Sequence, residues 1–574
     1  MDKAAVAEIL ERIASMMELK GENPFKVRAY QNGARALISS SEDLDALVRE
    51  DRLTDIKGIG KGLSENISAL VKTGKLAFYE ELLESVPPGL LELTRIHGVG
   101  PKKALVLYEK LGVKDLAGLQ NACTDGRIAA LKGFGKATAE NILKGISFHA
   151  EHAKEFLIDD AQEIADLILQ ELKKNKAIKR ISVCGSFRRC KEIVRDVDIL
   201  VGADAAKAPA IMEAFVKLPR VIRVLGQGET KSSVLFHGGI QADLRVVSDA
   251  QYPFALHYFT GSKEHNIVMR QRAQARDLKL NEYGLFKEDG TLVPCKDEPA
   301  LFAKLGLPYI PPELREDRGE FDAADKHLLP ELVEVKDLRG VFHVHSTWSD
   351  GRNELADMIA EAEKMGFEYV GISDHSQTAS YAGGLTVERV REQAKVIEKL
   401  RKQFKIHIFW GSECDILKEG KMDYPDDVLK NYDFVIASVH SLFKLPEEEQ
   451  TARVIRALKN KYVTHLGHIT GRLLLRRPGY ALNVPQVLRA AADEGVAVEI
   501  NALPDRLELD WREIPRAKAL GCRFSINPDA HSFGDLHGFG RGVGIARKGW
   551  LTRDDVINTL PLAKMQSYLK KRRY

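Results

Sequence analysis

Three aspartates near the middle of the chain have the spacing of a phosphoryl-transfer site. Asp196 and Asp198 lie in DVDILVG, a predicted strand, and they share one face because side chains alternate along a strand. Two carboxylates this close repel each other unless a divalent cation lies between them. Asp243 belongs to a second predicted strand, IQADLRVV. Three carboxylates on adjacent strands can hold two metal ions about 3.5–4 Å apart, which suits in-line displacement at phosphorus.

A Gly-Ser turn precedes the first two aspartates. Gly185 and Ser186 are expected to open a short helix, whose free N–H groups can hold the β- and γ-phosphates of a nucleoside triphosphate. Arg189 can neutralise those phosphates. A DxD pair alone is a weak signal, because most such pairs are solvated surface acids. The Gly-Ser turn, the DxD pair and the third aspartate together predict a nucleotidyl-transfer site.

Six histidines and three carboxylates in the C-terminal part of the chain form a second candidate metal site. They all lie at or near the ends of predicted strands: His343, His345, Asp350, His375, Glu413, His440, His468, Asp529 and His531. Mixed imidazole and carboxylate ligands suit zinc, manganese or iron better than magnesium alone. A single buried histidine is more often a hydrogen-bonded core residue. That interpretation applies to His407, His465, His537 and also to Asp374.

The N-terminal part contains three copies of one motif: IKGIGKGLSENI, IHGVGPKKALVL and LKGFGKATAENI. Each has two glycines in a turn, then a helix with a lysine near its start. These residues are Gly58, Gly60, Lys61, Gly98, Gly100, Lys102, Gly133, Gly135 and Lys136. Such a turn leaves backbone N–H groups free at a helix start, where a phosphate oxygen can bind. Three matched copies predict helix-hairpin-helix contacts that position DNA without reading its sequence.

The surrounding sequence predicts the elements that position these residues. Residues 1–150 predict short helices joined by glycine turns, and residues 151–177 predict one amphipathic helix. Four strands follow: RISVCGS, DVDILVG, SSVLF and IQADLRVV. After a stretch rich in proline and acidic residues (307–338), strand and helix patterns alternate to the end. This alternation predicts parallel strands with crossover helices, hence an α/β barrel with its catalytic residues at the strand C-termini.

Composition restricts the class of protein. The 574 residues are enough for three to five domains, and 44% of them are hydrophobic, as in globular proteins. The net charge of +3 means that any DNA-binding surface must be local. The six cysteines include no CxxC pair, so we expect reduced thiols. The chain starts with an amphipathic helix pattern instead of a signal peptide and lacks an apolar run of about 18 residues, so we expect a cytoplasmic protein.

The central motifs resemble the family X DNA polymerases, the family of polymerase beta. CGSFRRCKEIVRDVDIL resembles the palm motif of that family, and HYFTGSKEHNIVMR and LNEYGLF resemble its thumb. The likeness extends over about residues 1–316. It implies a deoxyribose pocket lined by Tyr258, Phe259 and Gly261, and contacts near the nascent base pair from Asn266 and Arg270.

Three features of this half bear on finer activities. NPFKVRAY resembles the family's 5′-phosphate pocket, which implies phosphate contacts from Lys26 and Tyr30. The family's Schiff-base lysine falls where this chain has Asn66, which cannot form an imine, so we expect little deoxyribose-phosphate lyase activity. Gln241 stands where vertebrate members have an arginine, a change that bears on the handling of the primer hydroxyl.

The C-terminal order HxH…DH…E…H…H…DxH resembles the PHP (polymerase and histidinol phosphatase) domain over about residues 338–574. All nine ligand positions of that family's trinuclear site are filled, which implies a working phosphoesterase. In repair polymerases the domain acts as a Mn-dependent 3′–5′ exonuclease, and some members also cut at abasic sites. The resemblance implies up to three ions here, Mn²⁺, Zn²⁺ or Fe²⁺, and Mg²⁺ or Mn²⁺ at the polymerase site.

These observations predict a multidomain chain. The expected fold class is all-α helix-hairpin-helix domains, an α+β nucleotidyltransferase palm and thumb, and a C-terminal distorted (β/α)7 barrel. The expected boundaries are 1–85 and 86–150 for two helical DNA-binding domains, 151–248 for the palm, 249–316 for the thumb, 317–338 for a linker and 339–574 for the PHP domain.

The function that follows is a monomeric, bacterial-type gap-filling DNA polymerase with a 3′-processing nuclease. Its partners are gapped or primed DNA and deoxynucleoside triphosphates, with no membrane. One alternative is a PHP phosphatase for a small phosphate ester, against which the three glycine repeats argue. Another is a DNA-binding scaffold with an inactive polymerase half, against which the intact aspartates argue.

Overall fold

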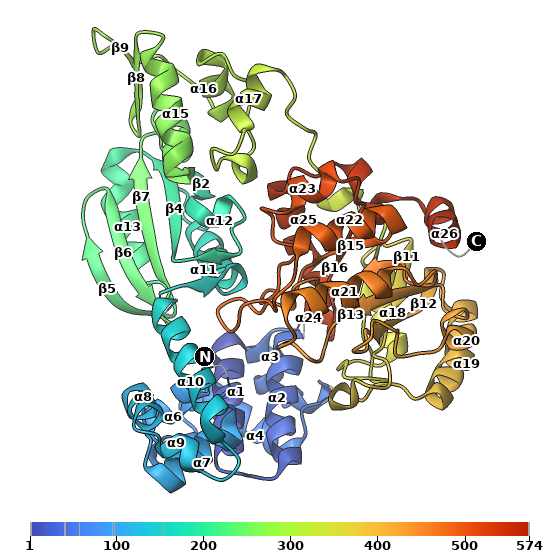
Figure 1. Cartoon of the computed structure of the whole chain (residues 1–574). Coiled ribbons are helices and arrows are strands. Elements are labelled where there is room, and N and C mark those ends of the chain that lie inside the picture. The colour runs from blue at the N-terminus through green and yellow to red at the C-terminus, as the bar shows by residue number, and fades with distance from the viewer. Residues whose placement is uncertain are drawn as a thin grey trace. The chain divides into compact units, whose positions relative to one another are not determined.

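The computed structural model describes residues 3–39, 42–56, 58–94, 96, 98–152 and 154–571 of the chain (Figure 1). The chain divides into two units. The first is mainly Met1–Ala153, and the second comprises Lys154–Leu474 and Pro478–Tyr574. Among the described residues, no helix is long and apolar enough to cross a membrane.

The first unit is helical, as its glycine-punctuated sequence predicts. Its α-helices are α1 (Lys3–Leu19), α2 (Pro24–Ser39), α3 (Leu44–Arg49), α4 (Lys61–Thr73), α5 (Ala77–Ser85), α6 (Pro88–Leu93), α7 (Pro101–Leu111), α8 (Leu116–Thr124), α9 (Arg127–Ala130) and α10 (Gly135–Glu151). Val6, Leu10, Ile13 and Met17 recur at helical spacing along α1 and are buried. They belong to one hydrophobic core that also includes Ile67 of α4.

A five-stranded sheet, in the order β2-β4-β7-β6-β5, carries the three aspartates. Its strands are β2 (Ile178–Val183), β4 (Asp196–Ala203), β5 (Val221–Gln227), β6 (Lys231–Phe236) and β7 (Gln241–Val247). Apolar residues of α11 (Ile158–Leu172) and α13 (Ala208–Val216) form a core with β4, β6 and β7. The edge strand β5 is not among the predicted strands, and its side chains after Val221 are exposed.

The prediction of one amphipathic helix over residues 151–177 is wrong. The strand β1 (Phe156–Leu157) pairs antiparallel with β3 (Ile193–Val194), and α11 begins only afterwards. The backbone of Leu157 is extended, and its N–H donates a hydrogen bond of 3.2 Å to the Asp160 carboxylate. A cap inside a periodic apolar stretch therefore starts a new helix, which periodicity alone does not reveal.

The segment after the sheet is a small α/β subdomain joined to it by buried charges. It contains α14 (Tyr252–Thr260), α15 (Lys263–Gln274), β8 (Leu278–Asn281), β9 (Gly284–Lys287) and α16 (Glu298–Lys304). Glu298 accepts from Arg315 at 2.5 Å and from Arg188 at 2.6 Å. Because Arg188 belongs to α12 (Gly185–Arg188), this pair fixes the Gly-Ser turn to the subdomain. The segment predicted as a linker contains α17 (Glu320–Asp325), in which Glu320 is buried.

The predicted α/β barrel is confirmed. Seven parallel strands follow one another in chain order. They are β10 (Gly340–Val344), β11 (Tyr369–Ile372), β12 (His407–Asp415), β13 (Phe434–Ser438), β14 (His465–Leu466), β15 (Ala497–Asn501) and β16 (Phe524–Asn527). A bridge between Val344 and Ala530 brings the first strand beside the last, so the barrel is nearly closed. The longer helices around it are α18 (Leu355–Lys364), α19 (Val387–Gln403), α21 (Glu447–Leu458), α22 (Val484–Glu494), α25 (Phe539–Lys548) and α26 (Leu562–Lys571).

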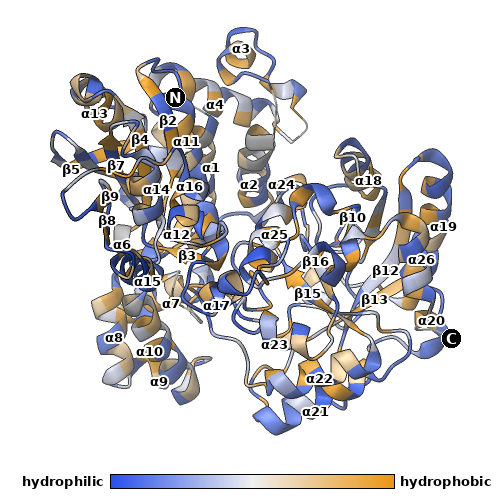
Figure 2. Cartoon of the chain, turned by 90° about the horizontal axis from the view of Figure 1, so that it is seen from above, coloured by the Kyte–Doolittle hydropathy of each residue, from blue (hydrophilic) through white to orange (hydrophobic). Residues whose placement is uncertain are grey.

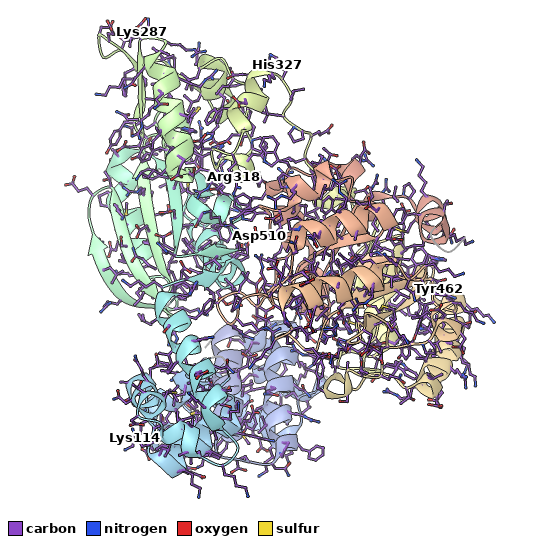
Figure 3. The ribbon with its side chains drawn as sticks, in the orientation of Figure 1. Lys114, Lys287, Arg318, His327, Tyr462 and Asp510 are labelled. Carbon is purple, nitrogen blue, oxygen red and sulfur yellow. The ribbon has the colours of Figure 1, made fainter. Side chains whose placement is uncertain are left out.

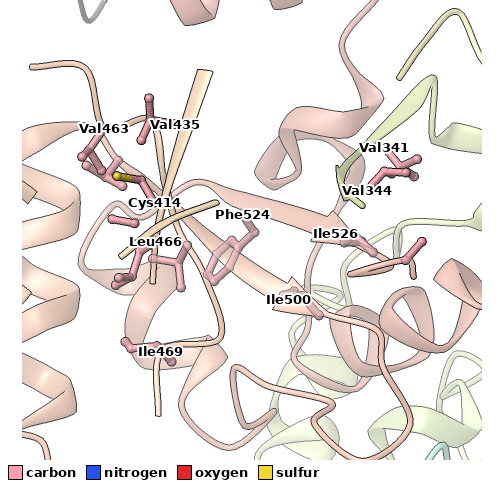
Figure 4. Close-up of a cluster of buried hydrophobic side chains, with 14 of the residues drawn as sticks. Val341, Val344, Cys414, Val435, Val463, Leu466, Ile469, Ile500, Phe524 and Ile526 are labelled. Carbon is pink, nitrogen blue, oxygen red and sulfur yellow. The ribbon is translucent and has the colours of Figure 1, made fainter. Parts of the chain in front are cut away.

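The barrel strands are buried along almost their whole length, and most of their side chains are hydrophobic, as is usual for parallel strands covered on both faces. Figure 2 shows hydrophobic, orange residues along β15 and β16 and hydrophilic, blue residues in many loops. Val341, Cys414, Ile500 and Phe524 come from four different strands and belong to one buried cluster (Figure 4). This packing fixes the strand ends, and therefore the polar side chains that follow them.

Candidate functional site

The three predicted aspartates lie at one end of two neighbouring strands. β4 and β7 are parallel, and their register sets Asp198 opposite Asp243 and Asp196 opposite Gln241. Asp196 and Asp198 are both partly exposed, whereas Val197 between them is fully buried. The two carboxylates therefore share the face that is open to solvent, as the alternation of a strand predicts.

The Gly-Ser turn lies directly against this carboxylate group. Gly185 has φ +63°, and a Cβ at this position would lie 2.5 Å from Oδ2 of Asp198. The N–H of Cys184 donates to the carbonyl of Asp198 at 2.8 Å, which ties the turn to β4. Only glycine fits here, both for its backbone conformation and for the close approach of the carboxylate.

The pKa values of Asp198 and Asp243 are shifted in opposite directions. Burial, followed by repulsion from Asp196 and Asp243, raises the pKa of Asp198 to about 7. Burial also raises the pKa of Asp243, but hydrogen bonds from Lys231 and Gln241 outweigh it and the net shift is downward. The ammonium of Lys231 lies 2.6 Å from Oδ2 of Asp243. This lysine was not predicted; its only signal is a charged residue at the start of the neighbouring strand.

A cavity of about 730 Å³ opens beside these carboxylates. All eight residues predicted to bind the deoxynucleoside triphosphate line it, together with Asp196 and Asp198. The eight are Gly185, Ser186, Arg189, Tyr258, Phe259, Gly261, Asn266 and Arg270. Lys191, Arg195, Lys263 and Arg512 also line the cavity and were not predicted. The cavity lining therefore combines cationic side chains with carboxylates, a composition that suits a polyanion bound together with metal ions.

The nine predicted ligands of the barrel converge at the carboxyl ends of its strands. Their donor atoms form four overlapping groups, within each of which all atoms lie within 4.8 Å of one another. The groups are His345, Asp350, His375 and His531; His343, Glu413 and His468; His343, His345 and Asp529; and His375, Glu413 and His440. Every predicted ligand is in at least one group.

Glu413 is the centre of this arrangement. Its Oε1 lies 2.8 Å from Nε2 of His468 and 3.2 Å from Nε2 of His440, and its Oε2 lies 2.9 Å from Nδ1 of His375. Asp529 bridges in the same way, with Oδ1 3.3 Å from Nε2 of His343. A carboxylate shared between several imidazoles is a geometry that suits bridged metal ions.

Two further carboxylates contact the Nδ1 atoms of two predicted ligand histidines. The sequence did not predict these carboxylates as site residues. Glu499 lies 2.5 Å from Nδ1 of His343, and Asp415 lies 2.6 Å from Nδ1 of His440. Such partners fix the tautomer of a ligating histidine and its ring orientation. Asp374 differs, because it is buried and accepts hydrogen bonds from Ser346 and other polar neighbours. It is a hydrogen-bonded core residue, as predicted.

The barrel residues fit a set of metal ions. Nε2 of His343 and both ring nitrogens of His345 are buried and have no hydrogen-bond partner among the described residues. Burial, with His531 and His375 as neighbours, lowers the pKa of His345 to about 3, so its imidazole is neutral. Buried and unpartnered imidazole nitrogens beside carboxylates are donors that a divalent ion can take as ligands.

Two more side chains border the barrel site. Nε of Arg506 lies 3.6 Å from Oδ2 of Asp529, and it is buried without a hydrogen-bond partner. Tyr381 is 70% exposed, and its ring centre lies 6.4 Å from those of His375 and His440. A cation and an exposed aromatic ring beside this set of donors can contact a phosphate and a nucleobase.

In the helical unit, two of the three glycine turns share one geometry. Gly58 and Gly98 have φ of +104° and +89°, and Gly60 and Gly100 are extended N-caps of α4 and α7. Lys61 and Lys102 follow as exposed residues. The third turn differs. Gly133 has φ +93° and Lys136 is exposed, but Gly135 has φ +68° and the N-cap is Phe134.

The proposed 5′-phosphate residues also lie in this unit. Lys26 is exposed on α2, and the hydroxyl of Tyr30 accepts a hydrogen bond of 2.7 Å from the Asn66 amide. Asn66 thus lies beside Tyr30 but carries no nucleophile.

Known protein families match four parts of the chain. These are "Helix-hairpin-helix domain" at residues 1–76, "SAM-like Helix-hairpin-helix tandem" at 90–147, "DNA polymerase beta thumb" at 255–316 and "PHP domain" at 342–502. Their order along the chain agrees with the order of the sequence motifs.

Individual relatives cover either the whole chain or one half of it. "DNA polymerase/3'-5' exonuclease PolX" of Bacillus subtilis (strain 168) is 39% identical over 576 residues, covering 100% of both chains. A "probable phosphatase" of Thermoanaerobacter sp. (strain X514) is 29% identical over 249 residues, 40% of this chain and 94% of its own. "DNA polymerase lambda" of Rattus norvegicus is 24% identical over 339 residues, 54% of this chain and 56% of its own.

Proposed function

The chain belongs to the family X DNA polymerases that carry a C-terminal PHP domain, and on this basis we propose that it fills short gaps during DNA repair and trims 3′ ends as a 3′–5′ exonuclease. The observation that carries the proposal is the presence of two complete and separate donor sets in one chain. The aspartate group lies beside the cavity of the palm, and the nine ligands lie in the barrel. A phosphatase acting on a small ester would need only the second set.

For the polymerase site we propose Mg²⁺ or Mn²⁺ as the ions held by Asp196, Asp198 and Asp243, because all their donors are oxygen. When bound, such ions activate the primer 3′-hydroxyl and neutralise the triphosphate. The N–H groups of the Gly185–Ser186 turn and the Arg189 guanidinium bind the β- and γ-phosphates.

The remaining cavity residues orient the nucleotide. We assign the deoxyribose pocket to Tyr258, Phe259 and Gly261, and contacts near the base pair to Asn266 and Arg270. Nδ2 of Asn266 donates to the carbonyl of Tyr258 at 2.8 Å, which joins these two parts of the pocket. Positioning of this kind turns the attack of the hydroxyl into an effectively unimolecular step.

For the barrel we propose up to three ions, Mn²⁺, Zn²⁺ or Fe²⁺, held by His343, His345, Asp350, His375, Glu413, His440, His468, Asp529 and His531. When bound, such ions lower the pKa of a water molecule and polarise the scissile phosphate. Arg506 holds the phosphate that is cleaved. Cleavage at abasic sites is a further activity of this same site that we propose to test.

We propose that the helical unit binds the backbone of gapped or primed DNA through Gly58, Gly60, Lys61, Gly98, Gly100 and Lys102, and more weakly through Gly133, Gly135 and Lys136. The two turns with matching geometry present their free N–H groups in the same way, whereas the third does not. Lys26 and Tyr30 bind the 5′-phosphate of the gap. The protein acts as a monomer.

The decisive experiment is incubation with a one-nucleotide-gapped duplex, with and without deoxynucleoside triphosphates, in Mg²⁺ and then in Mn²⁺. We expect addition of one nucleotide when triphosphates are present, and shortening of 3′ ends in Mn²⁺ when they are absent. A protein that shortens 3′ ends but adds no nucleotide in either metal would establish the scaffold alternative.

The same substrate tests the helical unit. A gap with a 5′-phosphate should be filled several-fold faster than the same gap without it, since a charge-assisted hydrogen bond to Lys26 is lost. Lys26→Met should remove the difference, and equal rates for the wild-type protein would contradict the assignment.

Borohydride should trap little covalent complex on an incised abasic site, because Asn66 cannot form the imine.

A further inference from the structure

Helix α25 of the barrel also packs against the palm and the thumb, through Arg541 and Arg547. Arg541, near its start, donates to Asp159 at 2.6 Å. One turn later, a Cβ on Gly544 would lie 3.2 Å from Sγ of Cys190, so the side chain of this palm residue approaches the helix closely there. Lys548, the last residue of the helix, lies on the same face because it follows Gly544 by four positions.

Lys548 is buried, and its ammonium uses its three donors on the polymerase half. Nζ lies 2.6 Å from Oε1 of Glu316, 3.0 Å from the carbonyl of Arg189 and 3.3 Å from the carbonyl of Glu313. The indole of Trp511 covers it at 4.5 Å. Burial of an ammonium costs several kcal/mol of desolvation, which only full pairing offsets. Lys548 therefore depends on these particular partners.

Glu316 links this lysine to the nucleotide cavity. Its Oε1 also accepts from Nε of Arg189 at 3.0 Å, and its Oε2 lies 3.8 Å from Nζ of Lys191. The Arg189 guanidinium donates to the carbonyl of Thr260 as well. Arg189 lines the cavity and is the residue proposed to bind the triphosphate. Glu316 therefore competes with the triphosphate for Arg189, and Lys548 competes with Arg189 for Glu316.

Arg512, a second cation of the barrel, also pairs with a palm carboxylate that lines the cavity. Glu192 of the palm lines the cavity and is buried, and its Oε1 accepts from the Arg512 guanidinium at 2.8 Å. Its Oε2 accepts from Trp511 at 3.0 Å. Arg512 lines the same cavity. Figure 3 labels Asp510, which pairs with Arg512 at 2.9 Å, and Arg318, whose guanidinium lies 5.3 Å from the Trp511 ring.

We propose that the PHP domain is a working part of the polymerase's nucleotide site: Lys548 and Arg512 neutralise Glu316 and Glu192, so that Arg189 is available to the triphosphate of the incoming nucleotide. The inference rests on the proposed polymerase function. Lys548 is a positioning residue, because it acts on the nucleotide through Glu316 and Arg189. Without it, the full charge of Glu316 holds Arg189 and opposes an incoming polyanion.

The test is Lys548→Met in the full-length protein, with gap filling measured over a range of nucleotide concentrations. We expect the KM for the deoxynucleoside triphosphate to rise by roughly tenfold or more, as when one partner of a buried charge pair is removed. The kcat should change much less, and 3′–5′ exonuclease activity should stay at the wild-type level. Lys518→Met is the matched control, because Lys518 pairs at 2.8 Å with Asp555 inside the barrel.

A second variant separates the charge mechanism from loss of packing. Lys548→Met combined with Glu316→Gln removes both charges, so we expect the KM to return to within about threefold of the wild-type value. If Lys548→Met does not fold, Arg512→Gln provides the test, because the Arg512 side chain is 41% exposed and its loss should also raise the KM. An unchanged KM in a folded Lys548→Met protein, or no recovery in the double variant, would overturn the inference. A wild-type protein that adds no nucleotide would instead refute the proposed function.

Discussion

The palm and the barrel each gather groups that can bind divalent ions, but they use different donor atoms. The palm places three carboxylates on two neighbouring strands of an open sheet, and two of them, Asp196 and Asp198, line a cavity of about 730 Å³. The barrel collects nine donors from its strand ends, and Asp350 and His531 are the most exposed of them. An open sheet offers few positions at one level, so its site is small and accessible, whereas a closed ring of strands can surround several ions.

The two sites also differ in how they hold their charges. In the palm, Asp243 pairs with Lys231 at 2.6 Å. In the barrel, carboxylates and imidazoles compensate one another. Burial lowers the pKa of His440, but the neighbouring Glu413 and Asp415 outweigh it and raise this pKa to about 9. Oxygen-only donors suit Mg²⁺ or Mn²⁺, and nitrogen-rich sets suit softer ions. The comparison therefore predicts two activities that can be removed one at a time.

The largest effect should come from Asp198→Ala. Asp198 is the carboxylate opposite Asp243 and against the Gly185 turn, and we expect its loss to remove a donor to both proposed metal ions. We expect nucleotide addition to fall by at least about 10³-fold, the scale for removal of one preorganised electrostatic group. DNA binding and 3′–5′ exonuclease activity should survive. Extension of a gapped primer at near the wild-type rate would refute the palm assignment.

The converse prediction concerns His343→Ala. Its Nε2 lies 3.3 Å from both Glu413 and Asp529, so the variant loses a donor common to two of the groups. We expect exonuclease activity to fall by about 10²-fold or more while gap filling persists. The melting temperature is measured beside both activities. A folded variant that still degrades 3′ ends at the wild-type rate would show that the barrel is not the nuclease.

Glu499→Gln should have a smaller effect on the same activity. Glu499 touches His343 through its ring Nδ1 and also accepts from the N–H of His468 at 2.8 Å, but it belongs to none of the four donor groups. Loss of such an orienting partner costs about 10–100-fold in metal affinity or activity. Added Mn²⁺ should therefore restore much of the exonuclease rate, whereas it should not rescue His343→Ala. Equal losses in the two variants would make Glu499 a ligand.

The convergence of the nine predicted side chains could be inferred from sequence because most of them lie at or just beyond the end of a strand that its hydrophobic run marks. The register of a parallel barrel then brings such positions together without further information. Glu499 and Asp415 lie within strands, where they resemble isolated polar residues, and only the packed barrel shows that they touch imidazoles. Lys548 lies 359 positions from Arg189, and no local pattern encodes a contact of that range. The break in the helix at Leu157 was not predicted for a different reason. There a local cap, the hydrogen bond from the Leu157 N–H to Asp160, interrupts an apolar pattern that keeps its helical spacing.

The smallest expected effect is that of Lys231→Met, and its sign is the informative part. The ammonium of Lys231 occupies Oδ2 of Asp243, so it competes with any cation for that oxygen. Its side chain is 40% exposed, and a pair of this kind is worth up to about 1 kcal/mol, or about fivefold. We expect the Mg²⁺ concentration for half-maximal gap filling to fall two- to fivefold, at saturating DNA and nucleotide.

The barrel has no lysine pair of this kind among its described ligands, so the Mn²⁺ requirement of the exonuclease should not change. Lys217→Met, which breaks a surface pair with Glu213 at 2.6 Å, is the control. A higher Mg²⁺ requirement in Lys231→Met would mean that this ammonium supports the carboxylate site instead of competing for it.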